Sequence, residues 1–269
     1  MYQEENFCRV KCMKRTAIIT IAGMSTRFSK SCGSDIHKAI YSDEKTNWTT
    51  LSHQLNLVKD ACDEIIIVTG HKHEDIKKYL DINFKNLPLK LVYNDHYFDY
   101  GSCYSLILGV EAVSESADEV IFLEGDLIFD TKSFNKLVNI HKNVITANNE
   151  LIDARTAVIF YINDKKKINY LYDTTHTILR VNEPFLIMGN SGQVWKFIYT
   201  KRLKTNLKNY GIEEYKGTNL VPINDYYKET SFDELEIVTF KEWFNCNTIN
   251  DYKKMKTYIE KEKQNGYFE

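Results

Sequence analysis

Small, hydroxylated and basic residues follow the first apolar run of the chain, a combination suited to binding phosphate. The run AIITI at positions 17–21 is rich in β-branched residues and predicts a buried strand. The next residues are, in order, Ala22, Gly23, Met24, Ser25, Thr26 and Arg27. Small residues in a loop after a central strand let backbone N–H groups approach phosphate oxygens, which a basic side chain neutralises. Neither a Walker loop nor a G-x-G-x-x-G fingerprint is present, and an ordinary turn with solvated bases is the alternative.

A second candidate site is the acidic turn Glu124-Gly125-Asp126, which follows the apolar run VIFL at positions 120–123. A carboxylate at the end of a buried strand is unfavourable to desolvate unless it is paired or binds a metal. Asp126 is therefore a candidate metal ligand, and the alternative is an acidic turn that reaches solvent.

These segments resemble the nucleotidyltransferases with a GT-A-like fold, whose signature is roughly L-A-A-G-x-G-[ST]-R-[FLM] with a downstream P-K-[AP]-[LM]. The matching segments here are IAGMSTRF at 21–28 and HKAI at 37–40. The resemblance implies that Arg27 and Lys38 are catalytic and that residues 22–26 bind the nucleotide. Two positions depart from the signature, because Ser25 replaces the second glycine and His37 replaces the proline before the lysine.

The segment WFNCNTINDY at 243–252 extends the resemblance to the metal site. In related cytidylyl- and uridylyltransferases a similar segment ends the last core strand and begins a helix. The resemblance makes Asn247 the second protein ligand, beside Asp126, of a catalytic Mg²⁺. Thr248 and Asp251 have the spacing of a capping pair, so a plain capped helix is the alternative. Asn245 stands where the family often has an acid.

The segment from Tyr93 to Leu106 is similar to phosphocholine cytidylyltransferases of bacterial lipopolysaccharide and teichoic acid pathways. Their pattern is N-x-x-[YF]-x-x-x-N-N-x-x-S-L, and this chain has Asn94 at its start and Gly101-Ser102 in place of Asn-Asn. The resemblance implies that Asn94, Gly101 and Ser102 bind the nucleotide. The alternative is a polar loop before a helix.

The acceptor site is expected in the second half of the chain. The segment ILRVNEP at 178–184 resembles the family's I-x-x-I-x-E-K-P and keeps Glu183 but not the lysine, which favours an acceptor smaller than a hexose 1-phosphate. A cationic choline group would prefer aromatic rings with an acid nearby. The candidates for this cage are Tyr161, Tyr172, Trp195 and Trp243, with Asp173 or Glu183 as the acid. The alternative is that these aromatic residues belong to the core.

The elements that position these residues alternate between strands and helices. Helical patterns cover 49–62, 73–80 and 103–113, and strand patterns cover 17–21, 64–69, 89–93 and 120–123. This order predicts a three-layer, Rossmann-like α/β fold with a mostly parallel sheet and ligands at the carboxyl ends of its strands.

The second half predicts a small β-rich insertion over the acceptor site. Its strands are expected at 156–162, 168–172 and 177–181, and residues 189–192 predict a loop before a helix that begins at 194. We expect an N-terminal extension over 1–15 and one nucleotidyltransferase domain over 16–269. Its nucleotide-binding half would be 16–130 and its acceptor-binding half 131–269.

Composition limits the partners. The formal charge of −2 does not favour a nucleic acid, and no apolar run has membrane-spanning length or the form of a signal peptide. The six cysteines are scattered, which favours free thiols in the cytoplasm and argues against zinc. We expect small-molecule substrates and a monomer or homodimer.

The sequence thus predicts a Mg²⁺-dependent cytidylyltransferase that transfers CMP from CTP to phosphocholine or a similar small phospho- or phosphonate acceptor and releases pyrophosphate. The first alternative is a sugar 1-phosphate nucleotidyltransferase. A glycosyltransferase on the same fold is a further alternative, since Glu124-Gly125-Asp126 is close to a D-x-D motif. A binding protein without catalysis is the last, because Ser25, His37 and Asn245 depart from the family pattern.

Overall fold

The structure is a computed structural model that describes residues 13–43, 48–154, 156–172 and 177–264. Most of the expected N-terminal extension and Asp173 lie outside these residues. The strands of the main sheet are β1 (Arg15–Ile21), β2 (Glu64–Thr69), β3 (Leu89–Tyr93), β4 (Glu119–Glu124), β6 (Asn143–Asn148), β7 (Ile159–Asn163), β8 (Ile168–Leu171), β9 (Phe185–Phe197) and β10 (Leu235–Thr239). A separate antiparallel pair consists of β5 (Leu127–Phe129) and β11 (Trp243–Asn245).

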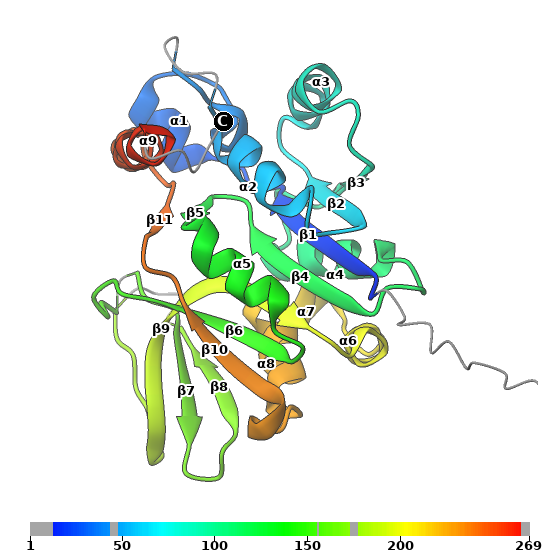
Figure 1. Ribbon diagram of the computed structural model, residues 1–269, viewed down its shortest axis with the longest axis vertical. Helices are drawn as coiled ribbons and strands as arrows, with labels where there is room; N and C mark the ends of the chain where they lie inside the picture. Colours follow the sequence, from blue (N-terminus) through cyan, green and yellow to red (C-terminus); the bar gives the residue numbers. More distant parts are fainter. Residues whose placement is uncertain (1–12, 44–47, 155, 173–176, 265–269) are drawn as a thin grey trace, which may run out of the picture.

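The helices connect these strands and cover the sheet (Figure 1). They are α1 (Thr26–Cys32), α2 (Thr50–Val58), α3 (His73–Asn83), α4 (Ser102–Ala112), α5 (Thr131–Asn139), α6 (Thr200–Leu207), α7 (Ile212–Tyr215), α8 (Leu220–Lys228) and α9 (Ile249–Gln264), with the short 3-10 turns η1 (Lys38–Ile40) and η2 (Phe232–Glu234). No helix in the described ranges is both long and apolar enough to cross a membrane.

The sheet is mostly parallel, as predicted. Its main path runs β10-β6-β9-β4-β1-β2-β3. Strands β1, β2, β3 and β4 are parallel, and β10 is parallel to β6. Because β9 is antiparallel to both β4 and β6, it alone runs against the other strands of this path. The carboxyl ends of β1, β2, β3 and β4 therefore meet at one edge, where a ligand site is expected.

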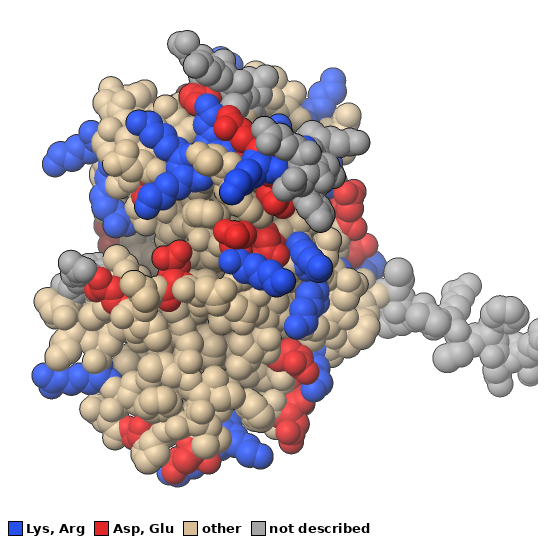
Figure 2. All heavy atoms as spheres, turned by 60° about the vertical axis from the view of Figure 1, so that its left-hand side comes forward, with Lys and Arg blue, Asp and Glu red and all other residues tan. Residues whose placement is uncertain are grey.

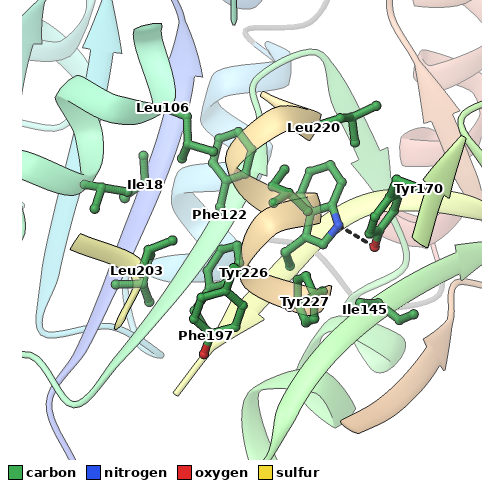
Figure 3. Packing of buried hydrophobic residues seen from close by; sticks show 14 of the residues in the cluster. Ile18, Leu106, Phe122, Ile145, Tyr170, Phe197, Leu203, Leu220, Tyr226 and Tyr227 are labelled. Carbon is green, nitrogen blue, oxygen red and sulfur yellow. Dashed lines mark hydrogen bonds between the residues drawn. The ribbon is translucent and has the colours of Figure 1, made fainter. Parts of the chain in front are cut away.

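Apolar side chains fill both faces of the sheet, which gives the three layers. One face packs against α4, α6 and α8 through a cluster that includes Ile18, Phe122 and Tyr226, and Figure 3 shows this packing. The other face packs against α2, α3 and α5 through residues such as Ile19 and Leu123. A third cluster joins α1 to α9 around Phe28, and these two helices lie side by side in Figure 1.

Several elements begin and end at or within one residue of the positions predicted from local sequence patterns. Thr49 caps α2, since its Oγ1 accepts a hydrogen bond from Ser52 N at 2.9 Å. Strands β2 and β3 have the predicted bounds, and α4 begins one residue earlier than predicted.

Two predictions in the β-rich part are wrong. Residues 177–181 form no strand. Residues 189–192, expected as a loop before a helix, lie inside the long strand β9, which continues through Phe197. The run VWKF is buried on the sheet, where pairing with β4 and β6 outweighs the glycine-rich local signal.

Candidate nucleotide-binding and transfer site

The loop after β1 turns sharply into α1. Ser25, at the position of the family's second glycine, has φ 53° and ψ 22°, in the left-handed region that favours glycine. Its Oγ accepts a 3.3 Å hydrogen bond from Lys38 N. The loop is also tied to the end of β2, since His71 N donates to Ala22 O at 3.0 Å.

His37 joins this loop to the turn that carries Lys38. Its Nδ1 accepts a hydrogen bond from Ala39 N at 3.2 Å, so the ring proton is on Nε2, which donates to Gly23 O at 3.0 Å. Burial lowers the pKa of His37 to about 4, so the ring is neutral at physiological pH. A buried neutral imidazole thus fixes the loop where the family motif has a proline.

Four of the predicted site residues meet beyond this loop. Lys38 Nζ lies 2.7 Å from Asp126 Oδ2 and 3.3 Å from Asn247 Oδ1. Arg27 also donates to Asn247 Oδ1, at 2.9 Å. Asn247 is placed by the start of α9, where Thr248 and Asp251 form the predicted cap. The two expected metal ligands therefore converge on one cation, the Lys38 ammonium group.

The first hollow of the site is a cavity of about 250 Å³ at the carboxyl ends of β1 and β4. Among its walls are these predicted nucleotide-binding residues and charged side chains: Ala22, Gly23, Ser25, Lys38, Asn94, Gly101, Ser102 and Asp126. Met24 and Thr26 are not among its lining residues, and Met24 is exposed. The structure therefore gathers most of the predicted nucleotide residues around one cavity.

Asn94 has a structural role in this wall. Its Nδ2 donates to Ser105 Oγ at 2.9 Å, and its Oδ1 accepts from His96 N at 2.9 Å. Both ends of the buried amide are thus used to shape the turn between β3 and α4. Gly101 is needed for a close approach, because a Cβ there would lie 2.0 Å from Gly217 O.

The sequence analysis did not identify Asn219 and assigned no binding role to Glu124, although both residues line the first hollow. Asn219 Nδ2 donates to Glu124 Oε1 at 2.8 Å. Burial and the neighbouring Asp126 carboxylate raise the pKa of Glu124. Glu124 was detectable as a second acid beside Asp126, whereas no local pattern marks Asn219.

A second hollow, of about 530 Å³, is lined by Asn247, whose Oδ1 is 3.3 Å from Lys38 Nζ in the wall of the first. Arg27 also lines the second hollow and contacts Asn247. Asn247 in turn contacts Lys38, so the two hollows meet at these three residues. Its further lining includes Glu150, Asn190, Gln193, Trp243, Asn245 and Lys254. Figure 2 looks onto this side of the molecule, where basic side chains gather on the upper part around α1 and α9.

The backbone of β9 is irregular where it borders the second hollow. Its register with β6 shifts between Ile145 and Ala147, and Gln193 has φ 54°. Gln193 is largely buried, and within the described residues no side-chain hydrogen bond of its amide is found. Strained backbone of this kind is often found at functional sites.

The predicted acceptor cage is not assembled as expected. Tyr161 donates to Glu183 at 2.8 Å, but neither residue lines the hollows described above. Tyr172 packs against the core. Trp195 is fully buried, stacks on Phe122, and donates to the Tyr170 hydroxyl along the dashed line of Figure 3. Trp195 therefore cannot contact an acceptor, and of the four aromatic candidates Trp243 alone lines the second hollow.

The arrangement is that of the nucleotidyltransferase fold. The structure of the inositol-1-phosphate CTP transferase from T. maritima matches with a TM-score of 0.66 at 14% identity, over 89% of this chain and 92% of that one. The CTP:phosphocholine cytidylyltransferase from Streptococcus pneumoniae matches with a TM-score of 0.62 at 17% identity, over 92% of this chain and 100% of that one.

By sequence, the chain belongs to the family described as a domain of unknown function (DUF6564), whose model matches residues 34–259. It is 30% identical over 119 residues to choline-phosphate cytidylyltransferase of Haemophilus influenzae, covering 44% of this chain and 46% of that protein. It is 27% identical over 128 residues to the catalytic subunit beta of mannose-1-phosphate guanylyltransferase of Drosophila pseudoobscura pseudoobscura, covering 47% of this chain and 33% of that protein. These matches span less than half the length of either relative.

Proposed function

We propose that this protein is a nucleotidyltransferase that transfers CMP from CTP to a small phosphorylated acceptor and releases pyrophosphate. The observation that carries the proposal is the cluster of Lys38, Asp126 and Asn247 at the junction of two hollows. We assign the hollow at the loop after β1 to the nucleotide and the other hollow to the acceptor. The similarity to a choline-phosphate cytidylyltransferase supports CTP as the donor.

The residues of the cluster fit a Mg²⁺ ion. Asp126 supplies a carboxylate oxygen and Asn247 an amide oxygen, both hard ligands, and both already converge on one cation. No group of three His, Cys, Asp or Glu side chains suited to a metal is found in the described part of the chain. Two protein ligands are enough for Mg²⁺, which takes nucleotide phosphates as further ligands and stabilises their charge.

The chain's own residues would position the reaction and neutralise its charge. Lys38 faces the nucleotide hollow, where its ammonium group would contact the phosphates. Arg27 faces the acceptor hollow instead, so we assign it to the acceptor phosphate and not mainly to the triphosphate. An acceptor phosphate oxygen would attack the α-phosphorus, and the bond to pyrophosphate would break. The acceptor is already anionic, so no protein base is needed.

The charges of the second hollow support phosphocholine or a similar zwitterion. Arg27 and Lys254 supply positive charge for a phosphate or phosphonate. Trp243 and Glu150 supply an aromatic ring and an acid for a quaternary ammonium group.

A sugar 1-phosphate is the second candidate acceptor. The amides of Asn190, Gln193 and Asn245 in the same hollow are suited to bind hydroxyl groups. The glycosyltransferase alternative is weaker, because Glu124 and Asp126 contact different partners and do not act as a joined D-x-D pair.

Pyrophosphate release in the presence of Mg²⁺ tests the proposal. Each nucleoside triphosphate should be combined with phosphocholine, aminoethylphosphonate and glucose 1-phosphate. We expect release with CTP and one of the two small acceptors. Release only with glucose 1-phosphate would keep the reaction and replace the acceptor, whereas no release in any combination would contradict the proposal.

Lys254→Met tests the acceptor hollow. We expect the KM for the acceptor to rise about tenfold, because a charge-assisted hydrogen bond to phosphate is lost, while the KM for the nucleotide stays unchanged. Lys253→Met is the matched control, since Lys253 is also exposed on α9 but does not line the hollow. Equal effects of the two substitutions, or a changed nucleotide KM alone, would contradict this assignment.

A further inference from the structure

Glu124 and Asp126 line the same hollow but contact different residues. Asp126 contacts Lys38, at the end where the phosphates are expected. Glu124, the last residue of β4, contacts Asn219 instead. The two acids are two residues apart in sequence, and their different contacts indicate that they have different roles.

Asn219 connects Glu124 to the other end of the hollow. Its backbone N donates to Ser102 Oγ at 2.9 Å, and its side-chain amide donates to Glu124 Oε1 at 2.8 Å. The Gly101-Ser102 turn is held against the segment before α8 by two further backbone bonds, from Gly101 N to Tyr215 O and from Cys103 N to Gly217 O. Glu124 is thus joined through Asn219 to the turn at Ser102, while Asp126, two residues further on, contacts Lys38.

The Glu124 carboxylate has unused acceptor capacity in this position. Oε1 is bonded to Asn219, and in the described ranges no donor to Oε2 is found. The carboxyl group can accept hydrogen bonds at its oxygens, and its raised pKa lets it also donate one. Beside a second carboxylate it needs partners that bring no negative charge. Hydroxyl groups of a ribose meet this need, and carboxylates bind ribose hydroxyls in other nucleotide-binding folds.

We propose that Glu124 binds a ribose hydroxyl of the nucleotide and that Asn219 positions its carboxylate, so that the protein selects ribonucleotides over deoxyribonucleotides. The inference rests on the proposed function and adds a specificity residue to it. In a nucleoside triphosphate the ribose lies between the base and the phosphates. We assign Glu124 to this middle position, because Asn219 joins it to the Ser102 turn and it precedes by two residues Asp126, the partner of Lys38.

Binding without acceptor tests the inference directly. Titration calorimetry with and without Mg²⁺ would compare CTP, 2′-deoxy-CTP and 3′-deoxy-CTP, with UTP and GTP and their deoxy forms in parallel. The proteins are the wild type, Glu124→Gln, Asn219→Ala and the control Glu74→Gln. Glu74 is an exposed acid on α3 and is not among the lining residues of the hollow. Thermal unfolding of each variant checks that it is folded.

We expect the wild type and Glu74→Gln to bind the ribonucleotide about tenfold or more tightly than at least one deoxy form. Glu124→Gln should reduce this ratio to within about twofold, because ribonucleotide affinity falls and deoxynucleotide affinity hardly changes. Asn219→Ala should reduce the ratio part of the way.

Three results would overturn the inference. Equal weakening of ribo- and deoxynucleotides in Glu124→Gln would show a structural role. A changed Mg²⁺ requirement with an unchanged ratio would make Glu124 a metal ligand. In both cases the proposed function would stand. If the wild type bound no nucleoside triphosphate at all, the proposed function and the inference would fall together.

Discussion

At the residue scale, His37 shows how this chain holds the loop after β1 in place without the motif's proline. Its φ of −72° is one that proline also adopts. Proline would, however, provide neither the hydrogen bond to Gly23 O nor the acceptor for Ala39 N. The histidine therefore ties the loop and the Lys38 turn together by two side-chain bonds, of which the one accepted from Ala39 N exists only while the ring is neutral.

This dependence predicts a loss of stability in mild acid. Burial lowers the pKa of both His37 and His53 to about 4. An unfolded histidine titrates near 6.5, so between these values the unfolded state binds more protons and stability decreases as pH falls. Urea unfolding at pH 7 and pH 5 should show a decrease on the order of 2 kcal/mol for each ring. His37→Gln should lose its share of this decrease, and an unchanged pH dependence in that variant would contradict the assignment.

Ser25 carries backbone strain at the turn into α1. A β-branched residue tolerates the left-handed conformation poorly, so Ser25→Val should lower the free energy of unfolding by about 1–2 kcal/mol relative to Ser25→Ala. Both variants lack the hydroxyl group that accepts from Lys38 N, so the comparison isolates the backbone. The measurement is urea unfolding, and equal stability of the two variants would show that the loop has no such strain.

At the element scale, a buried charge cluster anchors β9 to the rest of the sheet. Lys196 Nζ is 2.9 Å from Glu119 Oε2 on β4 and donates to Val138 O and Ile140 O at the end of α5. Arg15 on β1 pairs with the other oxygen of Glu119. The side chains of Lys196 and Glu119 are fully buried, so the pair fixes three elements at one place.

Removal of one partner should therefore be strongly destabilising. Lys196→Met leaves the buried Glu119 carboxylate with fewer partners and should lower the free energy of unfolding by roughly 3–5 kcal/mol. Lys142→Met is the control, because its pair with Glu236 is half exposed and contributes about 0–1 kcal/mol. Thermal or urea unfolding would measure both, and a loss below about 1 kcal/mol for Lys196→Met would contradict this role.

Elements with a clear local signal could be predicted from sequence, and β9 could not. Strand β2 is a continuous apolar run between a charged residue and Gly70, so its bounds are marked in the chain itself. Strand β9 contains Gly189 and Gly192, which indicate a loop by local rules. A Cβ at Gly192 would lie 2.6 Å from Thr146 Oγ1, so this glycine serves close packing between strands and not a turn. Such a tertiary requirement is not visible in local sequence.

At the scale of the whole molecule, the site depends on contacts between distant parts of the chain. The parallel strands bring the loop after β1 and the turn after β4 to one edge of the sheet. This arrangement could be predicted from the alternation of strands and helices in the sequence. Arg27 and Asn247 are 220 positions apart, and their proximity was predicted only through the family resemblance. Asn219 carries no motif, because its role follows from where α8 begins against the Ser102 turn.

The same scale explains why the residues of the predicted acceptor cage are not gathered at one place. Aromatic residues were expected to form a cage, but Trp195 is in the core that joins β9 to α8. The hollow that we assign to the acceptor is instead built from α1, α9, β11 and the irregular part of β9. Only the packing of the third cluster, which holds α9 beside α1, places Lys254 and Arg27 on one hollow.

The central claim is that Lys38, Asp126 and Asn247 form the reaction centre between the two hollows. The most direct test is Mg²⁺-dependent pyrophosphate release by Lys38→Ala and Asp126→Ala, with the nucleotide and acceptor on which the wild type is active. Lys30→Ala is the control, since Lys30 is exposed on α1 and lines neither hollow. We predict that both site variants stay folded and lose at least about 10³-fold in kcat, an electrostatic contribution of this size being typical, while the control keeps its activity. Near-normal turnover in either folded variant would contradict the account.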